Sequence, residues 1–369
     1  MSYDVAGSKS AAISGTVITK TVANDVNSYI GSNTTIANAD SINVSALNKT
    51  SASAIIGNVS VGGQAAVGAS LYTNVNASNV NAGIKSGAKI GTESKVGDVT
   101  ISADSIQDYR SINFAVGASS SAAVTGSINT NIVVNETNAY IENGTDINSN
   151  GKLTVNASDS MDAQNFQLAV AGASGAAVGV ISDINVLNNK VNSIVGKTNS
   201  DDNTRKGKLS FGNNADISAL SEQNYQANVL MVAGSGSAAV GGVAISNTMA
   251  SDVNSGIENT TLISENGKIN VNAESSFNKK HKNQTTGIGK LLKDDKSLKK
   301  TSLTTDDLEA TDMLPLVSIL NVAASGGVGV SGTVVNNNVI TTVNSYVKYA
   351  DVNSASGLNV NANSSMTTY

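Results

Sequence analysis

The sequence is poor in the residues that form most globular cores and most catalytic sites. Its 369 residues include no cysteine, no tryptophan, one proline and one histidine, and only 4% are aromatic. A chain without cysteine has neither disulfides nor thiolate metal sites. With a single histidine, it also lacks the partner needed for most nucleophile–base pairs. We therefore expect a non-enzymatic protein with no cofactor and no metal.

Charge and long apolar runs are scarce as well. Only 14% of residues are charged and the net charge is −5, so the basic footprint of a nucleic-acid-binding protein is missing. No apolar run approaches the roughly 18 residues that span a bilayer, and no signal peptide follows Met1. The chain opens in the middle of a repeat, which predicts that it is a segment of a longer polypeptide with flanking repeats.

What the sequence does contain is a recurring run of Ala, Gly, Ser and Val. Its clearest copy is LAVAGASGAAVGVI, Leu168–Ile181, which we expect to form one strand with close packing on both faces. An apolar residue marks the same point in each copy, with steps of 54, 57, 54, 62 and 88 residues. These residues are Ile13, Val67, Val124, Val178, Val240 and Val328. Repetition of this kind indicates a repeat architecture.

Two further motifs, of the types VNxxI and LTVNA, follow in the same order in every unit. Their apolar residues alternate with polar ones, as in Val80–Ile84, where Val80, Ala82 and Ile84 share one side. A period of two is typical of half-buried strands. Between the strands, Gly residues predict tight corners with positive φ. The four pairs are Ser86-Gly87, Asn143-Gly144, Asn150-Gly151 and Asn266-Gly267.

These patterns predict an all-β fold, a right-handed parallel β-helix (β-solenoid) of about six repeat units of about 54 residues. We expect each unit to hold three coils of about 18 residues or two of about 27, in a rod roughly 60–85 Å long. A six-bladed propeller is the alternative, although blade signatures are missing. The many Asn residues either form amide ladders between coils or mark turns, and the sequence alone does not decide between these two.

A charged insertion interrupts the repeats. Units one to five occupy residues 1–276, the insertion residues 277–314, and unit six residues 315–369. The insertion holds eight of the 23 Lys and Arg residues and the only histidine, and its leucine spacing predicts short helices. It is either a partner-contacting arm or a solvated loop. Its candidate contact residues are Lys279, Lys280, His281, Lys282, Lys290, Leu291, Leu292 and Lys293.

Two stretches carry a resemblance to a known class of proteins: AVAGASGAAVGVISDINVLNNKVNSIV (Ala169–Val195) and GKLTVNASDS (Gly151–Ser160). They resemble the repeat regions of large Gram-negative surface exoproteins, namely filamentous-haemagglutinin-like and autotransporter adhesins, and above all fusobacterial leukotoxin-like exoproteins. The resemblance implies secretion, exposure at the bacterial surface, and attachment to a host-cell protein or glycan or to other bacteria. This class has no fixed catalytic motif, so the resemblance assigns no functional residue to this sequence.

Three functions follow as hypotheses. The first is an adhesin stalk that presents binding loops, anchored to the outer membrane by another part of its parent protein. The second is a segment of a secreted cytotoxin whose insertion contacts a membrane or receptor. The third, a β-helical polysaccharide-acting enzyme, would need paired carboxylates, which are more typical here of solubilising charge. The pairs are Asp201-Asp202, Asp294-Asp295 and Asp306-Asp307.

Overall fold

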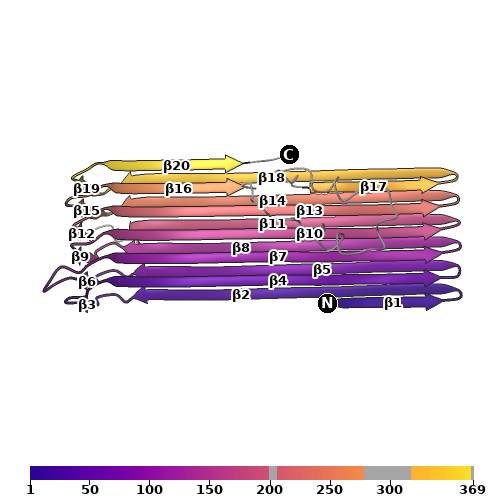
Figure 1. The fold of residues 1–369 in the computed structure, drawn as a ribbon, viewed down its shortest axis with the longest axis horizontal. Helices are drawn as coiled ribbons and strands as arrows, with labels where there is room; N and C mark the ends of the chain where they lie inside the picture. Colours follow the sequence, from indigo (N-terminus) through magenta and orange to yellow (C-terminus); the bar gives the residue numbers. More distant parts are fainter. Residues whose placement is uncertain (199–205, 278–316, 367–369) are drawn as a thin grey trace, which may run out of the picture.

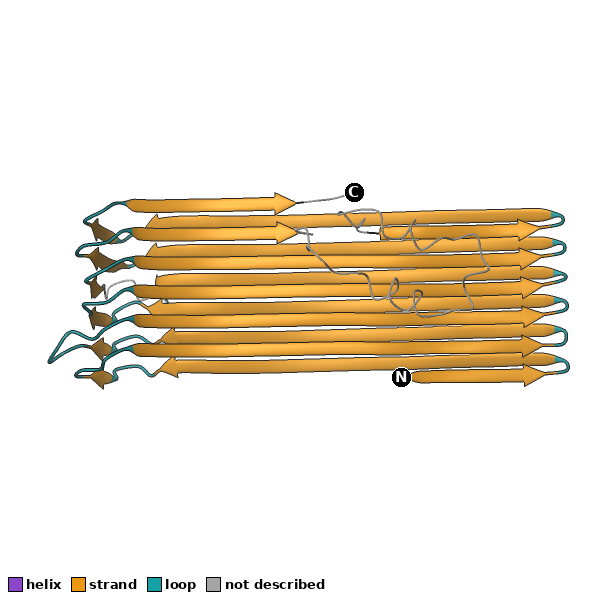
Figure 2. Ribbon diagram, viewed as in Figure 1, coloured by secondary structure: helices purple, strands orange, loops and turns teal. Residues whose placement is uncertain are grey.

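The structure is a computed structural model that describes residues 1–198, 206–277 and 317–366. This part of the chain is all-β and contains no helix, and its strands form three sheets (Figures 1 and 2). Sheet A contains β1 (Ser2–Ser8), β4 (Ile42–Gly62), β7 (Val99–Ser119), β10 (Leu153–Ala173), β13 (Ala215–Ser235), β16 (Ile269–Phe277), β17 (Val317–Ser325) and β20 (Leu358–Met366).

Sheet B faces sheet A, and sheet C closes one end of the coil. Sheet B contains β2 (Ala11–Ile30), β5 (Ala65–Ile84), β8 (Ala122–Glu142), β11 (Ala176–Lys197), β14 (Ala238–Glu258) and β18 (Val328–Lys348). Sheet C contains the short strands β3 (Thr35–Ile36), β6 (Lys89–Ile90), β9 (Asp146–Asn148), β12 (Gly207–Phe211), β15 (Thr260–Ser264) and β19 (Asp351–Ser354).

Each repeat unit is a single coil. The chain runs along sheet A, turns within two residues, returns along sheet B and passes through sheet C to the next coil (Figure 1). Every strand pairs in parallel with the strand one coil away; Val124, for example, pairs with Val178. The prediction of a parallel β-solenoid is therefore confirmed. The parallel pairing between units excludes the propeller.

The predicted coil size and rod shape are wrong. A long strand of 21 residues spans about 70 Å, and seven rows of sheet A about 4.8 Å apart give a stack about 30 Å high. The molecule is therefore wider across one coil than along the stack. The error came from treating the repeated motifs as separate short strands, whereas the alternation continues through each long strand without a break.

The run Leu168–Ile181 is also not one strand. It comprises the end of β10, the turn at Ser174 and Gly175, and the start of β11. A Cβ on Gly175 would lie 2.3 Å from the carbonyl oxygen of Ser121 in the coil below. The two sheets converge at this turn, and only small side chains fit between them. A column of buried alanines fills the space: Ala12, Ala66, Ala123, Ala177 and Ala239.

The core side chains become larger toward the end of the coil opposite the two-residue turns, where the three sheets meet. There the predicted inward residues Val80, Ala82 and Ile84 are all fully buried, which confirms the alternation. They pack in one cluster with larger side chains such as Phe211 and Leu153. The solenoid is thus filled by alanine at the two-residue turns and by branched or aromatic side chains at the corner with sheet C.

The glycines at the corners divide into two kinds. Gly87 and Gly144 adopt positive φ as predicted, at 77° and 71°. Gly151 and Gly267 do not, so for them the prediction is wrong. A Cβ on Gly151 would lie 2.4 Å from the Oδ1 atom of Asp98. Glycine is needed here because the two coils approach closely, and not because the backbone is left-handed.

One repeat marker needs correction. The structure pairs Val240 with Val330, whereas Val328 pairs with Ala238. The last step is therefore 90 residues instead of 88. The insertion hid this two-residue shift because both valines lie in the same alternating run.

Asparagines of the VNxxI motif stack into a continuous amide ladder, which we call the Asn ladder. From the second coil on, each side-chain Nδ2 donates to the Oδ1 of the coil below over 2.8–3.0 Å. The members are Asn27, Asn81, Asn138, Asn192, Asn254 and Asn344. The ladder interpretation is confirmed here, while Asn33 and Asn259 mark turns with positive φ. Asparagine thus has both roles, at different positions.

The charged insertion leaves sheet A from the middle of a strand. Phe277 is the last residue of β16 and is buried, so it belongs to the repeat and not to the insertion. β16 pairs with Ala215–Gln223 of β13, and β17 pairs with Ala227–Ser235 of the same strand. Both therefore lie in one row of the sheet, separated by the width of three residues. The predicted helices fall outside the described residues.

Candidate functional site

The residues that the sequence nominated as a contact site all lie outside the described residues. This holds for Lys279, Lys280, His281, Lys282, Lys290, Leu291, Leu292 and Lys293, and for the three carboxylate pairs. What the structure provides is the place where the insertion leaves the solenoid, between Phe277 and Val317 on sheet A. The surfaces and clusters of the solenoid itself are therefore the sites that can be built from described residues.

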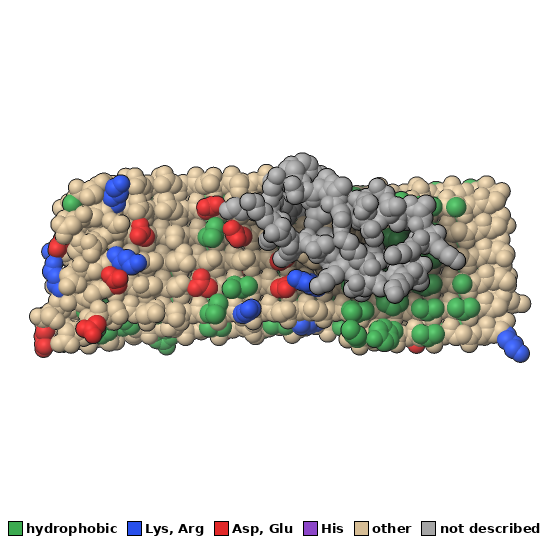
Figure 3. Space-filling view, in the orientation of Figure 1, with side chains coloured by type: hydrophobic (Ala, Val, Ile, Leu, Met, Phe, Trp, Pro, Cys, Tyr) green, Lys and Arg blue, Asp and Glu red, His purple; other side chains and the backbone are tan. Residues whose placement is uncertain are grey.

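The outer face of sheet A carries an apolar patch near the two-residue turns (Figure 3). Its centre is a column of valines, one from each coil, which we call the valine column: Val5, Val59, Val116, Val170, Val232 and Val322. Beside it stand large side chains such as Phe114 and Leu168. Val5 and Val322, at the two ends of the column, are 75% and 37% exposed, and the four valines between them are partly exposed. Contiguous exposed apolar surface of this kind marks interaction sites.

The outer face of sheet B has a matching apolar column at the same end of the coil. It consists of Ile13, Val67, Val124, Val178, Val240 and Val330. These are the residues that marked the repeat in the sequence, apart from the shift in the last unit. They point outward, and Ile13 is 74% exposed. Both broad faces of the slab are thus apolar toward the turns.

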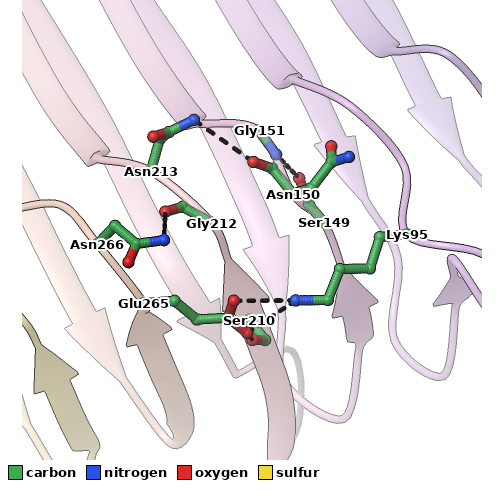
Figure 4. A network of polar contacts seen from close by, with 9 residues as sticks. All are labelled: Lys95, Ser149, Asn150, Gly151, Ser210, Gly212, Asn213, Glu265 and Asn266. Carbon is green, nitrogen blue, oxygen red and sulfur yellow. Dashed lines mark hydrogen bonds and ion pairs between the residues drawn. The ribbon is translucent and has the colours of Figure 1, made fainter.

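Polar contacts between coils occupy the opposite end, at the corner between sheets C and A (Figure 4). The Lys95 ammonium lies 2.9 Å from both carboxylate oxygens of Glu265, and the Ser210 hydroxyl donates to the same carboxylate. Lys95 holds the pKa of Glu265 below its usual value. Nearby, Asn266 donates to the Gly212 carbonyl of the coil below. The Lys95–Glu265 pair spans three steps of the stack, and the other two contacts fasten successive coils together at this exposed edge.

A second charged cluster surrounds Tyr140. The ammonium groups of Lys85 and Lys197 each lie 4.9 Å from the centre of its ring, and Lys85 pairs with Glu142 at 3.2 Å. Burial lowers the pKa of Lys197. The pKa of Lys85 is raised, because hydrogen bonds to Tyr140 and Glu142 outweigh its partial burial. Cations against an aromatic face gain about 0.5–2 kcal/mol, so the cluster stabilises this corner.

A carboxylate also lies in the core between sheets A and B. Asp183 is fully buried and accepts hydrogen bonds from Tyr225 at 2.9 Å and from Asn129 at 2.7 Å. Burial raises the pKa of Asp183 and, still more, that of Tyr225. The side chains that surround the carboxyl are neutral, and two of them belong to the neighbouring coils. Its hydrogen bonds therefore tie three coils together from the inside.

A second buried carboxylate, Asp159, faces Asn189 across the core. It accepts hydrogen bonds from Asn189 and Ser105, and burial raises its pKa to about 7. Asn189 in turn accepts from Asn135 at 3.1 Å, which extends the contact to the coil below. Neither Asp159 nor Asp183 can reach a substrate outside the solenoid. Both are structural groups.

Comparisons of the chain with protein-family models, with curated proteins and with solved structures find no match. In the part of the chain that the structure describes, no helix is long and apolar enough to cross a membrane, and no group of acidic, His or Cys residues could hold a metal ion. The resemblance to surface exoproteins stays a prediction.

Sequence reasoning missed both apolar columns and the buried carboxylates, although signals for each exist. Aligning the units places a valine four positions before the first residue of each two-residue turn, which identifies the valine column. Asp183 stands at an inward position of its alternating strand, two residues after the buried Ile181. Because every second residue of this strand points inward, the alternation alone could have placed this aspartate in the core.

Proposed function

We propose that this chain is a structural and binding segment of a secreted bacterial surface adhesin. It forms a rigid scaffold that presents loops for attachment to a host-cell protein or glycan, or to other bacteria. Its surface location depends on a part of the parent protein outside this sequence. One observation carries the proposal: the strands on both sides of each added segment stay paired with the neighbouring coils.

The two insertions support a presenting role in different ways. The first joins β11 to β12 in the sequence. β11 pairs with β8 and β14, with one register shift at Val195 and Lys197, and β12 pairs with β9 and β15. Residues 278–316 interrupt a strand in mid-sheet, where an added segment is hardest to accommodate. Yet β16 and β17 both remain paired with β13. A stack that holds its register around added segments is suited to carry variable loops.

An enzymatic role is less well supported. In the part of the chain that the structure describes, the carboxyl groups with a raised pKa are Asp159 and Asp183, and both are fully buried in the core. Among described residues, the exposed Glu265 has a lowered pKa and is paired with Lys95, which favours a structural ion pair over a general acid. Cleavage of a polysaccharide by the purified chain would contradict the proposal.

The insertion can be removed without breaking the sheet. β16 and β17 contribute nine residues each, and the complete strands of sheet A contain 21. Three residues therefore bridge the gap, and the Asp-Ala-Gln sequence of residues 162–164 fits because it fills these positions in β10. The variant in which this link replaces residues 278–316 should stay folded, with an unchanged β-type circular-dichroism spectrum.

Binding of labelled protein to host epithelial cells and to bacteria then tests the proposal. We expect saturable binding by the full chain and at least tenfold weaker binding by the bridged variant. A matched control replaces exposed Lys49 with Ala on the same face of sheet A. Loss of cell killing by the bridged variant would instead favour the cytotoxin. Absence of saturable binding by the full chain would contradict an attachment role.

A further inference from the structure

The outer face of sheet B carries no charged side chain over most of its length. In each of its six long strands, seven successive outward positions, which run from Ala11 to Ala23 in β2, hold only Gly, Ala, Val, Ile, Leu, Ser, Thr or Asn. We call this surface the sheet B face. Its large side chains are well exposed: Ile128, Val134 and Val180 are 42%, 46% and 47% exposed. Contiguous exposed surface of this kind marks an interaction site.

The sheet B face is large enough to hold a protein partner. It spans about 40 Å along the strands, at about 3.3 Å per residue, and about 24 Å across its six rows, at about 4.8 Å per row. These dimensions give about 1,000 Å², whereas each partner buries about 800 Å² in an interface of standard size. Further coils of a longer polypeptide would add rows to sheet B and would not cover its outer face. The face is therefore available to a separate molecule.

The next outward position along each strand carries the charges that border this face. We call it the border column, and its members are Asp25, Asn79, Glu136, Lys190, Asp252 and Thr342. Glu136 and Lys190 lie on adjacent strands, pair at 3.7 Å and remain 43% and 49% exposed. A two-fold axis parallel to the strands, between β8 and β11, would place Glu136 of each copy opposite Lys190 of the other. An axis along the stack, through the centre of the face, would instead place Lys190 over the turn at Ser174 and Gly175, which carries no charge.

The axis that matches the charges also places large side chains opposite small ones. Because it exchanges β8 with β11 and β5 with β14, residues of one column would face each other across the contact. Three large–small pairs result: Val180 with Gly126, Ile128 with Ser182, and Leu71 with Ala244. A Cβ built on Gly126 has no atom within 4 Å, so there is a hollow above it that a valine can enter. Alternating large and small residues on facing sheets lets their side chains interdigitate.

The chemistry of the sheet B face does not suit a lipid surface. Membrane-surface segments combine basic residues, which attract anionic lipids, with aromatic anchors. The face has neither an aromatic ring nor a Lys or Arg residue, and its border column has three carboxylates and one lysine. What the face does match, in both charge and side-chain size, is its own two-fold image.

We propose that two copies of this chain form a dimer through their sheet B faces, related by a two-fold axis that runs parallel to the strands between β8 and β11. The contact uses the same surface on both copies, so it closes at two. Sheet A of each copy stays on the outside of the dimer. The axis is placed by the charges of Glu136 and Lys190, in the interior of the stack, and the inference does not depend on a role in adhesion.

The first test compares exposed valines on the two broad faces. Val180 lies on the sheet B face, and Val61, which is 51% exposed, lies on the outer face of sheet A. In sedimentation velocity the 369-residue chain should form dimers as its concentration rises. Val180→Lys should raise the dissociation constant at least a hundredfold with an unchanged circular-dichroism spectrum, and Val61→Lys should leave it unchanged. A chain that stays monomeric at every concentration, or a dimer that only Val61→Lys disrupts, would overturn the proposal.

An exchange of charges tests the direction of the axis. Glu136→Lys alone brings lysines opposite lysines, and Lys190→Glu alone brings glutamates opposite glutamates, so each variant should dimerise at least tenfold more weakly. An equal mixture of the two variants should form mixed dimers about as tightly as the unmodified chain, because each copy then supplies the charge that the other lacks. Mixing that gives no gain over the separate variants would overturn the two-fold arrangement.

A pair of glycines in one column tests the match of side-chain size. A Cβ on either Gly126 or Gly332 has no atom within 4 Å, so both valine variants should keep the monomer fold. Gly126→Val would meet Val180 of the second copy and should weaken dimerisation at least tenfold. Gly332→Val faces Gly15 of the second copy and should leave dimerisation unchanged. Equal effects of the two substitutions would overturn the proposed alignment of the faces.

Discussion

Central coils and end coils contain the same kinds of residue at equivalent positions, yet their environments differ. Ile269, in a row that has neighbours on both sides, is fully buried, and Leu358, its partner in the end row, is 44% exposed. Asn192 has ladder partners on both sides, whereas Asn344 has a partner on one side. Burial is therefore a property of a column in the stack, and each coil is stabilised mainly by its neighbours.

The largest expected effect comes from truncating two side chains of one apolar column, one inside the stack and one in its end row. Ile269→Ala should lower the free energy of unfolding by about 2–5 kcal/mol, because it leaves a cavity in a closed core. Leu358→Ala should cost less than half as much, since its side chain is already partly in water. Urea unfolding followed by circular dichroism measures both. Equal losses would contradict the comparison.

The Asn ladder gives the next largest effect. Asn192→Ala would remove two hydrogen bonds and leave the buried Asn138 oxygen without its donor, which costs about 1–3 kcal/mol. Asn344→Ala removes one bond at an exposed end and should cost less than about 1 kcal/mol. If the two substitutions shift the urea midpoint equally, the ladder does not act as a continuous stack.

The dependence of stability on pH should come from a buried carboxyl group, Asp159, in the middle of the stack. Burial raises the pKa of Asp159 from 3.8 to about 7, whereas the end positions of its column are Asn48 and Ser364. The folded state then binds more protons than the unfolded state between these two values. The stabilising contribution of this group is thus fully present below about pH 4 and is lost as the pH rises through about 7.

Asp159→Asn should remove the contribution of this group to the change of stability with pH. The variant should be more stable than the unmodified protein at pH 8, and its urea midpoint should vary less between pH 4 and 7. The buried Asp183 adds a slope of the same direction in both proteins. Parallel pH profiles would show that Asp159 does not titrate in this range.

The sequence predicts the repeat and the alternation because each is a local pattern, and it offers the Asn ladder as one of two interpretations that only the structure decides between. The coil length, in contrast, is not determined by any local pattern. A period of two says which residues share a face, but not where the chain turns, and the turn at Ser174 and Gly175 lies inside an unbroken Ala/Gly/Val run. For the same reason, the exit of the insertion after Phe277, in mid-strand, could not be distinguished from a loop between strands.

The most direct test of one coil per repeat uses the absence of native cysteine. In the structure Val124 and Val178 are neighbours on adjacent strands of sheet B, which lie about 4.8 Å apart, within reach of a disulfide. The double variant Val124→Cys, Val178→Cys should form an intramolecular disulfide under mild oxidation. Coils of about 18 residues would instead stack Val178 near Ser160, which the structure places in sheet A. A disulfide in Ser160→Cys, Val178→Cys, with none in the first variant, would contradict the fold.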